Sequence, residues 1–336
     1  MDSLQYCLFH TSPLADMPVQ PDYRIKTYAI VNAASDEKHF HQFLKWHIPH
    51  AILYKEDDAI ELETVAPYLI ELDETHDHTQ WLMTKQWGTH SVIYLKSHYA
   101  LEPLAEHFRR YTKVIVEPRE NDNRIETPAF FAFYDPRVMK HYFTVMTREQ
   151  MTEFCDPVIS FSYEDDDQSD HLLTSYLKKS GEQWSTLTTT LGKITVPDDD
   201  TTETTEDTLP ELEDEIEVPV MPVILTIAQQ EAFDERQQKR FCRRLLNDLQ
   251  THYPVSPDDS DEALYYLKEA VNNGLTSEAT QSRYILTALL IKNSPLEKSK
   301  KLRNALKTTQ DEPSRMKLLD QALEELTTKK EKARVG

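Results

Sequence analysis

The stretch Ala129–Met139 reads AFFAFYDPRVM and contains a predicted strand, a turn and the start of a helix. Its first five residues, Ala129–Phe133, form an apolar run rich in β-forming aromatic side chains, which predicts a buried strand. Pro136 favours the first turn of a helix, because its missing N–H would have no partner there. Asp135, directly before it, is a favoured helix-capping residue. A strand followed at once by a helix is the unit from which α/β domains are built.

The same alternation extends toward the N-terminus, where short apolar runs predict strands and apolar residues three or four apart predict helices. The predicted strands are Thr27–Ala33, Ala51–Tyr54, Tyr68–Leu72, Ser91–Leu95 and Lys113–Glu117. The predicted helices are one capped by Ser35, Thr79–Trp87, Leu101–Tyr111, one that begins at Pro136, and one that begins with a capping box of Thr147 and Gln150. We therefore predict an α/β domain with a mixed sheet and helices over residues 20–160. The order of its strands does not follow from the sequence.

The pattern changes after this domain. The segment 161–196 is uncertain in structure, although Leu172–Thr190 suggests a hairpin. Residues 197–222 carry many acids and no Lys or Arg, and their mutual repulsion predicts an acidic, disordered linker. Residues 223–294 show helical periodicity throughout and predict a smaller all-α domain. The Lys-rich stretch 295–336 predicts a helical tail.

Composition and charge narrow the classes of function. The chain has 336 residues, of which 39% are hydrophobic, and a formal net charge of -21. Because such a charge repels phosphate groups, we expect neither nucleic acid nor a membrane surface as a partner. The three cysteines are far apart and form no CxxC pair, which indicates a reducing compartment. The N-terminus has neither a basic segment nor a long apolar core, so we expect no Sec signal peptide and a cytoplasmic protein.

The residues that carry chemistry form no complete catalytic motif. With only 5 glycines, the chain contains neither a GxGxxG nor a GxxxxGK[ST] phosphate loop, and no GxSxG elbow. His76 and His78 could join Asp135 in a metal-assisted hydrolase, and this alternative stays open. The simpler interpretation places both histidines in a solvated loop, with Asp135 as a helix cap and Arg137 paired with a nearby acid. We predict no catalytic residue, no metal, no cofactor, and therefore no enzyme.

Four stretches together resemble one known family. They are YAIVNAA near Thr27, APYLIELD at Ala66–Asp73, WLMTKQWG at Trp81–Gly88 and FAFYDPRVM at Phe131–Met139. Their order and spacing are similar to those of the N-terminal domain of type VI secretion effector chaperones, the Tap or Tec adaptors, catalogued as domain of unknown function 4123. The segment 225–292 resembles the C-terminal part of these adaptors more weakly.

The resemblance implies a cytoplasmic, non-enzymatic adaptor that holds a secreted effector (a toxin) and joins it to the VgrG spike protein. Because two modules can hold two proteins at once, our own hypothesis is that the two domains divide effector and spike between them. Arg137 and Asp135 are the better candidates for partner contact, because Arg is enriched at binding hot spots, whereas Tyr134 and Pro136 are expected to build the fold. An antitoxin-like protein that neutralises a toxin is the alternative binding role. The family-marking residues are Trp81, Trp87, Tyr134, Asp135, Pro136 and Arg137.

Overall fold

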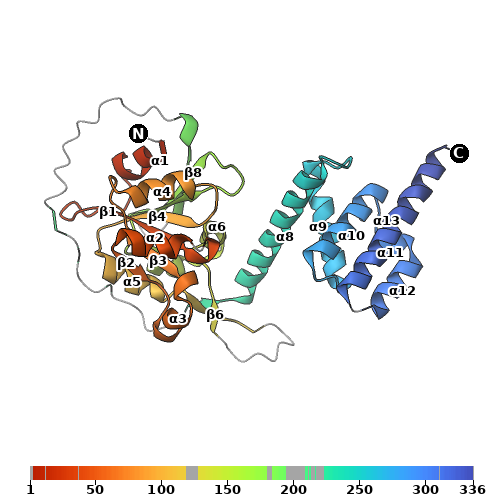
Figure 1. Cartoon of the computed structure of the whole chain (residues 1–336), viewed down its shortest axis with the longest axis horizontal. Coiled ribbons are helices and arrows are strands. Elements are labelled where there is room, and N and C mark those ends of the chain that lie inside the picture. The colour runs from red at the N-terminus through yellow and green to blue at the C-terminus, as the bar shows by residue number, and fades with distance from the viewer. Residues whose placement is uncertain are drawn as a thin grey trace. The chain divides into compact units, whose positions relative to one another are not determined.

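The chain divides into two compact units, Met1–Gln230 and Glu231–Gly336 (Figure 1). Among the described residues, the first unit holds two sheets flanked by helices and the second holds helices alone. The predicted fold class, an α/β unit followed by a smaller all-α unit, is therefore confirmed. The computed structural model describes residues 3–11, 13–36, 38–118, 128–179, 184–193, 209–210, 212, 216, 223–309 and 311–335.

Seven strands form the main sheet in the order β2-β3-β1-β4-β7-β8-β9, and every neighbouring pair is antiparallel. Helices alternate with strands along the chain, yet the sheet is not the parallel one that this alternation often accompanies, because β3 and β4 both run opposite to β1 between them. β8 and β9 pair where the sequence suggests a hairpin. The strands are β1 (Lys26–Asn32), β2 (His50–Ile52), β3 (Pro67–Glu71), β4 (Val92–Ser97), β7 (Ser160–Glu164), β8 (His171–Leu177) and β9 (Trp184–Thr190).

A second sheet of three short strands has the order β10-β5-β6. β10 (Ile224–Leu225) runs parallel to β5 (Lys113–Val116), which runs antiparallel to β6 (Pro128–Phe130). The strand predicted over Ala129–Phe133 therefore ends earlier than expected. Its later aromatic residues leave the sheet because they are needed in the core, where Phe133 is fully buried.

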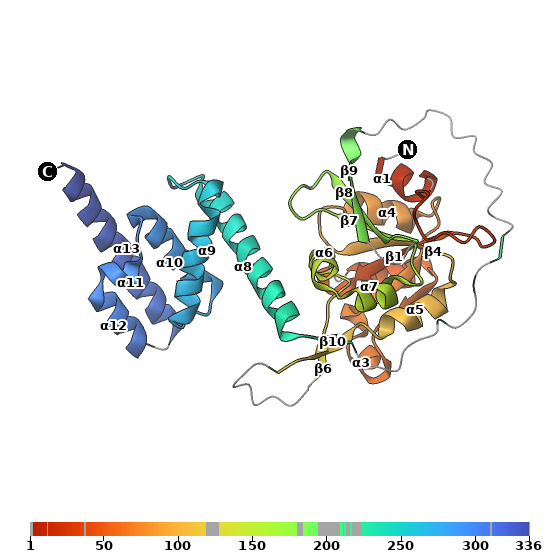
Figure 2. The ribbon, with the colours of Figure 1, turned by 180° about the vertical axis from the view of Figure 1, so that it is seen from behind.

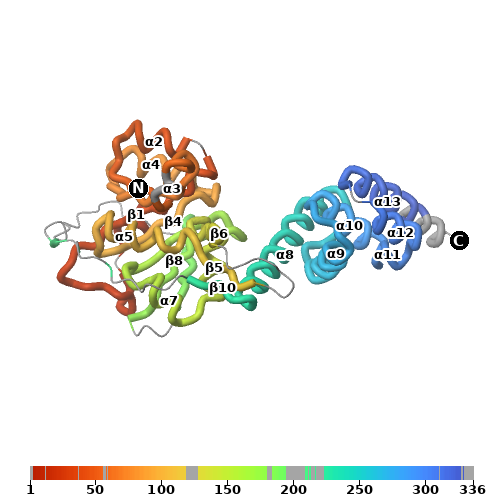
Figure 3. The backbone as a smooth tube through the Cα atoms, turned by 90° about the horizontal axis from the view of Figure 1, so that it is seen from below, coloured from red at the N-terminus to blue at the C-terminus, as the bar shows by residue number. Residues whose placement is uncertain are grey.

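Helices cover both faces of the main sheet (Figures 1 and 2). On one face, Phe43 of α2 packs 5.2 Å from Tyr68 of β3, between ring centroids. On the other, Phe154 of α7 packs 5.5 Å from Phe161 of β7. Figure 3 shows α2 and α4 on one side of β1 and β4, with α7 on the opposite side. The helices of this unit are α1 (Ser3–Gln5), η1 (Tyr6–His10), η2 (Ala33–Ser35), α2 (Lys38–Trp46), α3 (Glu56–Glu61), η3 (Glu63–Val65), α4 (Asp77–Lys85), α5 (Leu101–Arg109), α6 (Pro136–Val145), α7 (Arg148–Cys155) and η4 (Leu191–Lys193).

An aromatic core holds α5, α6 and α7 against the sheet. Phe154 is fully buried at its centre, with ring centroids 4.8 Å from Tyr111, 5.6 Å from Phe133 and 5.7 Å from Tyr142. These contacts are edge-to-face, the arrangement that aromatic quadrupoles favour. The start of α7 is fixed by the predicted capping box, in which Thr147 and Gln150 exchange hydrogen bonds. This core sets the position of α6, which carries the most distinctive sequence motif.

The second unit packs around its own apolar core, which includes Leu246, Leu267, Tyr284, Ile285 and Leu319. Among the described residues, no helix combines the length and the apolar composition that a membrane crossing requires. α8 begins within the first unit and continues into the second. The helices are α8 (Ile227–Leu249), η6 (Pro257–Asp259), α9 (Ser260–Asn272), α10 (Glu278–Ile291), α11 (Pro295–Lys298), α12 (Lys300–Thr308) and α13 (Glu312–Val335).

Most of the predicted acidic linker, 197–222, lies outside the described residues. One described residue within it, Leu212, is buried and forms backbone hydrogen bonds with the first unit, donating to His98 at 3.0 Å and accepting from Ala100 at 2.9 Å. After this stretch, β10 returns the chain to the second sheet. The described residues within the predicted linker are Leu209, Pro210, Leu212 and Ile216.

Candidate partner-binding site

The first turn of α6 is organised by the Asp-Pro-Arg sequence. Asp135 caps the helix, and its Oδ1 accepts a hydrogen bond from the backbone N–H of Arg137 at 2.8 Å. Pro136 occupies the first helical turn, where no N–H is needed. The predicted capping role of Asp135 is therefore confirmed, and the acid that pairs with Arg137 is the cap itself.

Arg137 forms a two-pronged ion pair with Asp135. Its Nε donates to Oδ1 at 2.8 Å and its Nη2 donates to Oδ2 at 2.5 Å. The hydrogen bond to Asp135 raises the pKa of the Arg137 guanidinium above its ordinary value, and the charges of Asp166 and Glu164 act in the same direction. The Arg137 side chain is 38% exposed, against 12% for Asp135. The motif thus presents a fixed guanidinium to the surrounding solvent.

Tyr134 and Pro136 belong to the interior. Tyr134 is 7% exposed, and its hydroxyl lies 2.8 Å from that of Tyr54, in the loop after β2. Burial, together with this hydrogen bond, raises the pKa of Tyr134 far above its ordinary value. Pro136 is also buried. These positions agree with the expectation that the two residues build the fold.

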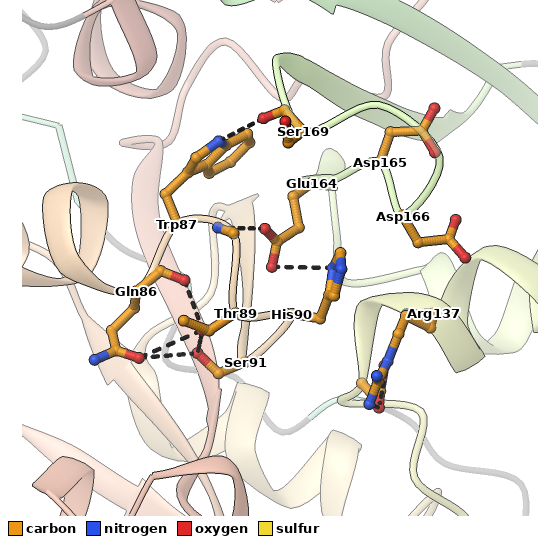
Figure 4. Close-up of polar contacts among 12 residues, drawn as sticks. Gln86, Trp87, Thr89, His90, Ser91, Arg137, Glu164, Asp165, Asp166 and Ser169 are labelled. Carbon is orange, nitrogen blue, oxygen red and sulfur yellow. Dashed lines mark hydrogen bonds and ion pairs between the residues drawn. The ribbon is translucent and has the colours of Figure 1, made fainter. Parts of the chain in front are cut away.

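The turn after α4 docks onto the loop that joins β7 and β8 (Figure 4). The indole N–H of Trp87 donates to the carbonyl oxygen of Ser169 at 2.9 Å. The backbone N–H of Gly88 donates to Oε2 of Glu164 at 2.5 Å, and Nδ1 of His90 lies 3.2 Å from Oε1 of the same carboxylate. Glu164 is almost completely buried, so these contacts fix the turn in place. Trp87 is therefore attached to the same loop that faces α6.

Lys140, one turn further along α6, faces the acidic residues of this loop. Its Nζ lies 2.6 Å from Asp165, 2.8 Å from Asp166 and 3.3 Å from Asp167. Burial alone would lower the pKa of Lys140, but the hydrogen bonds that it donates to Asp165 and Asp166, with the charges of these carboxylates, raise it above its ordinary value. Of the described residues, these three aspartates are the one group of His, Cys, Asp or Glu whose ligand atoms gather closely enough to suit a metal ion. In this structure the lysine ammonium forms ion pairs with all three of them.

We call this region the α6 surface, and it combines three segments that are distant in the sequence. The acidic run between β7 and β8 is visible in the sequence, but nothing there links it to α6 or to the turn after α4. Glu164 and Lys140 were therefore not predicted as site residues. The α6 surface consists of Trp87, His90, Arg137, Lys140 and the loop Asp165–Ser169, and the buried Glu164 at the end of β7 lies beneath it.

Trp81 lies in a different environment from Trp87. It belongs to α4 and packs among aromatic and imidazole rings, with centroids 5.2 Å from His39, 5.8 Å from His78 and 6.0 Å from Trp46. Burial lowers the pKa of His39 to about 4 and that of His78 to about 3. Both imidazoles are thus neutral over the physiological range. The structure gives Trp81 a packing role between α2 and α4.

The residues of the alternative hydrolase site are not assembled. His76 caps α4, and its Nδ1 accepts a hydrogen bond from the backbone N–H of His78 at 3.1 Å. His78 is buried against Trp81, whereas Asp135 is paired with Arg137. The two histidines do line a cavity of about 300 Å³. Its walls are formed by His47, Ile48, Pro49, Glu71, Asp73, His76, His78 and Thr79.

The comparisons with known proteins agree with this architecture. Residues 27–153 match the family model described as "Domain of unknown function (DUF4123)". The matched range begins in β1 and ends in α7, so it includes the Asp-Pro-Arg motif, Trp81 and Trp87. No curated protein and no solved structure matches the chain. The α/β unit of this chain therefore contains a DUF4123 domain, the domain found in type VI secretion effector adaptors.

Proposed function

We propose that this chain is a bacterial, cytoplasmic adaptor without enzymatic activity, which binds a type VI secretion effector and helps to load it onto the VgrG spike. The observation that carries the proposal is the match of residues 27–153 to the DUF4123 model, because that domain occurs in effector adaptors. The residues around α6 also suit a binding role. Their polar groups cap α6 and attach the turn after α4 to the end of β7 and the loop that follows it, so the side chains of this surface are held in order.

The α6 surface is the contact region that we propose for one of the partners. Its half-exposed Arg137 side chain is held by three hydrogen bonds to Asp135, so little side-chain entropy remains to be lost on binding. An ordered guanidinium can donate hydrogen bonds to a carboxylate of the partner or stack on an aromatic ring. Trp87 adds apolar area next to the same loop. This combination of Arg and Trp is typical of interface hot spots.

The experiment that tests the proposal is affinity purification of the tagged chain from its native cells, followed by mass spectrometry. We expect the VgrG protein together with one toxin-like protein. Cells that lack the chain should no longer secrete that toxin, yet should still resist it when it is delivered from outside. Loss of resistance without loss of secretion would instead indicate an antitoxin. Recovery of neither protein, from cells that make the secretion apparatus, would contradict the adaptor role.

We further propose that the two units divide effector and spike between them. A clean test removes Glu231–Gly336 and keeps everything up to Gln230, because β10 and Gln229 belong to the first unit: Gln229 donates to the carbonyl oxygen of Val145 at 2.8 Å. We expect the shortened chain to retain one partner in co-purification and to lose the other. If both partners are lost while circular dichroism shows an intact α/β unit, the division is wrong.

A further inference from the structure

The described strands leave four sheet edges, and three of them are poor sites for pairing. β10 and β6 have two and three residues, and β6 begins with Pro128. β2 also has three residues, and Nε of Arg109 donates to the carbonyl oxygen of Ile52 at 2.9 Å, which blocks that edge. Short length, proline and a side chain on the edge are common means of preventing unwanted strand pairing.

β9 is protected by none of these means. It has seven residues, reads WSTLTTT, and contains neither a charged residue nor a proline. On its inner side it pairs with β8 along its full length, from Trp184 opposite Leu177 to Thr190 opposite His171. The described part of the chain offers no hydrogen-bond partner to the outer backbone groups of β9. Thr186, Leu187 and Thr188, at its centre, are exposed.

A row of hydroxyl groups crosses the sheet and ends at this edge. The hydroxyl of Tyr163 in β7 lies 2.9 Å from that of Ser175 in β8, which lies 2.9 Å from that of Thr186 in β9. All three side chains are on the face covered by α6 and α7, where Trp184 packs 4.1 Å from Phe143. A further strand would continue this row if it placed a hydroxyl opposite Thr186.

We propose that β9 pairs with β9 of a second copy of this chain, antiparallel and centred on Leu187. This register places each Leu187 opposite its equivalent, and Thr186 opposite Thr188 of the other copy. The hydroxyl row then continues across the two-fold axis, and Ser185 meets Thr189 on the other face. Because opposite residues in antiparallel strands share a face, every pair joins side chains that suit strands.

The absence of charge in β9 makes this edge suitable for a contact between two acidic chains. Each chain has a net charge of -21, so two copies repel one another at long range. β9 offers a contact without any charge in the strand itself. The dimer should therefore become tighter as salt screens the remaining repulsion. A strand from a different protein, drawn to the acidic chain by its own positive charge, would bind more weakly as salt rises.

Sedimentation velocity of the full chain, over a range of protein and sodium chloride concentrations, tests the proposal. We expect a concentration-dependent dimer that is tighter at 500 mM than at 50 mM salt. Leu187→Lys places two like charges opposite each other and should raise the dissociation constant at least about tenfold. Leu44→Lys, at an exposed apolar position of α2, is the matched control and should leave the dimer unchanged.

Cysteine cross-linking checks the register. Cys7 is partly exposed, whereas Cys155 and Cys242 are buried, so the test uses a Cys7→Ser background. There Leu187→Cys should form a disulfide-linked dimer under mild oxidation, whereas Thr190→Cys, which faces Trp184 of the other copy, should not. A monomer at every concentration and salt would overturn the proposal. So would equal dimerisation of Leu187→Lys, or cross-linking at both cysteine positions. If the chain is monomeric and Leu187→Lys abolishes binding of purified VgrG, the edge accepts a partner strand and the second copy is wrong.

Discussion

At the scale of single residues, Asp135 and Arg137 bond to each other but should contribute differently to stability and to partner binding. Asp135→Ala should lower the free energy of unfolding by roughly 1 to 2 kcal/mol, because the N-terminus of α6 loses its cap. Arg137→Ala should cost less than about 1 kcal/mol, since it removes a half-exposed ion pair and leaves the cap. Urea denaturation of both variants measures the difference.

Arg137→Ala should instead weaken partner binding, by about tenfold if Arg137 is a hot spot. Asp170→Ala, directly after the loop of the α6 surface and with a side chain that is 65% exposed, is the control for stability and for binding. If Arg137→Ala destabilises the fold as much as Asp135→Ala and binds its partners normally, the residue is structural and the α6 surface loses its main contact.

The buried imidazoles around Trp81 make stability depend on pH. Burial holds the folded-state pKa of His39 at about 4 and that of His78 at about 3, below the ordinary value of 6.5. The unfolded chain therefore binds more protons, so the stabilisation is fully present above pH 6.5 and is lost as the pH falls toward these folded values. The chain should therefore lose unfolding free energy between pH 7.5 and pH 5. In His78→Phe this loss should be smaller by about 2 kcal/mol. Urea denaturation at both pH values measures this loss, and His41→Phe, at an exposed histidine, is the control. If His78→Phe loses as much unfolding free energy between pH 7.5 and pH 5 as the unaltered chain, this explanation is wrong.

At the scale of elements, the turn between α4 and β4 depends on one glycine. Gly88 has φ of +89°, a conformation that residues with a Cβ rarely adopt, and its N–H bonds to buried Glu164. Nothing lies within 4 Å of an added Cβ, so the cost of Gly88→Ala comes from the backbone, and should be about 1 kcal/mol. Thermal melts of both variants measure this cost. Gly192 has no positive φ and also has open space around an added Cβ, so Gly192→Ala should leave the melting temperature unchanged. Equal melting temperatures for the two variants would contradict this explanation.

The elements themselves could be predicted, because caps and periodicity act over a few residues. Asp135, Pro136 and the Thr147–Gln150 capping box gave the starts of α6 and α7. Sheet order could not be predicted, since it depends on pairings such as Ile93 with Tyr163, which lie far apart in the chain. The assembly of the candidate site could not be predicted for the same reason. Its Asp-Pro-Arg part is local, but the contact of Gly88 with Glu164 joins two segments that only the folded sheet brings together.

At the scale of the whole molecule, the charge is divided unequally. The helical unit, Glu231–Gly336, has slightly more Lys and Arg than Asp and Glu, so the first unit holds all of the net negative charge. Two units of such different charge favour different partners, because complementary charge speeds association and excludes like-charged proteins. This supports the proposed division of effector and spike, and it explains why removal of one unit should leave the other interaction intact.

The parallel pairing of β10 with β5 has a topological result for the chain. Ile224 of β10 aligns with Ile115 of β5, and the backbone of Leu212 bonds to His98 and Ala100, so the chain is attached to the first unit at Leu212 and again at β10. A protease that cut between η4 and β10 would therefore break one covalent bond without separating the pieces. The nicked chain would hold together as a complementing pair of fragments, and the helical unit would stay attached.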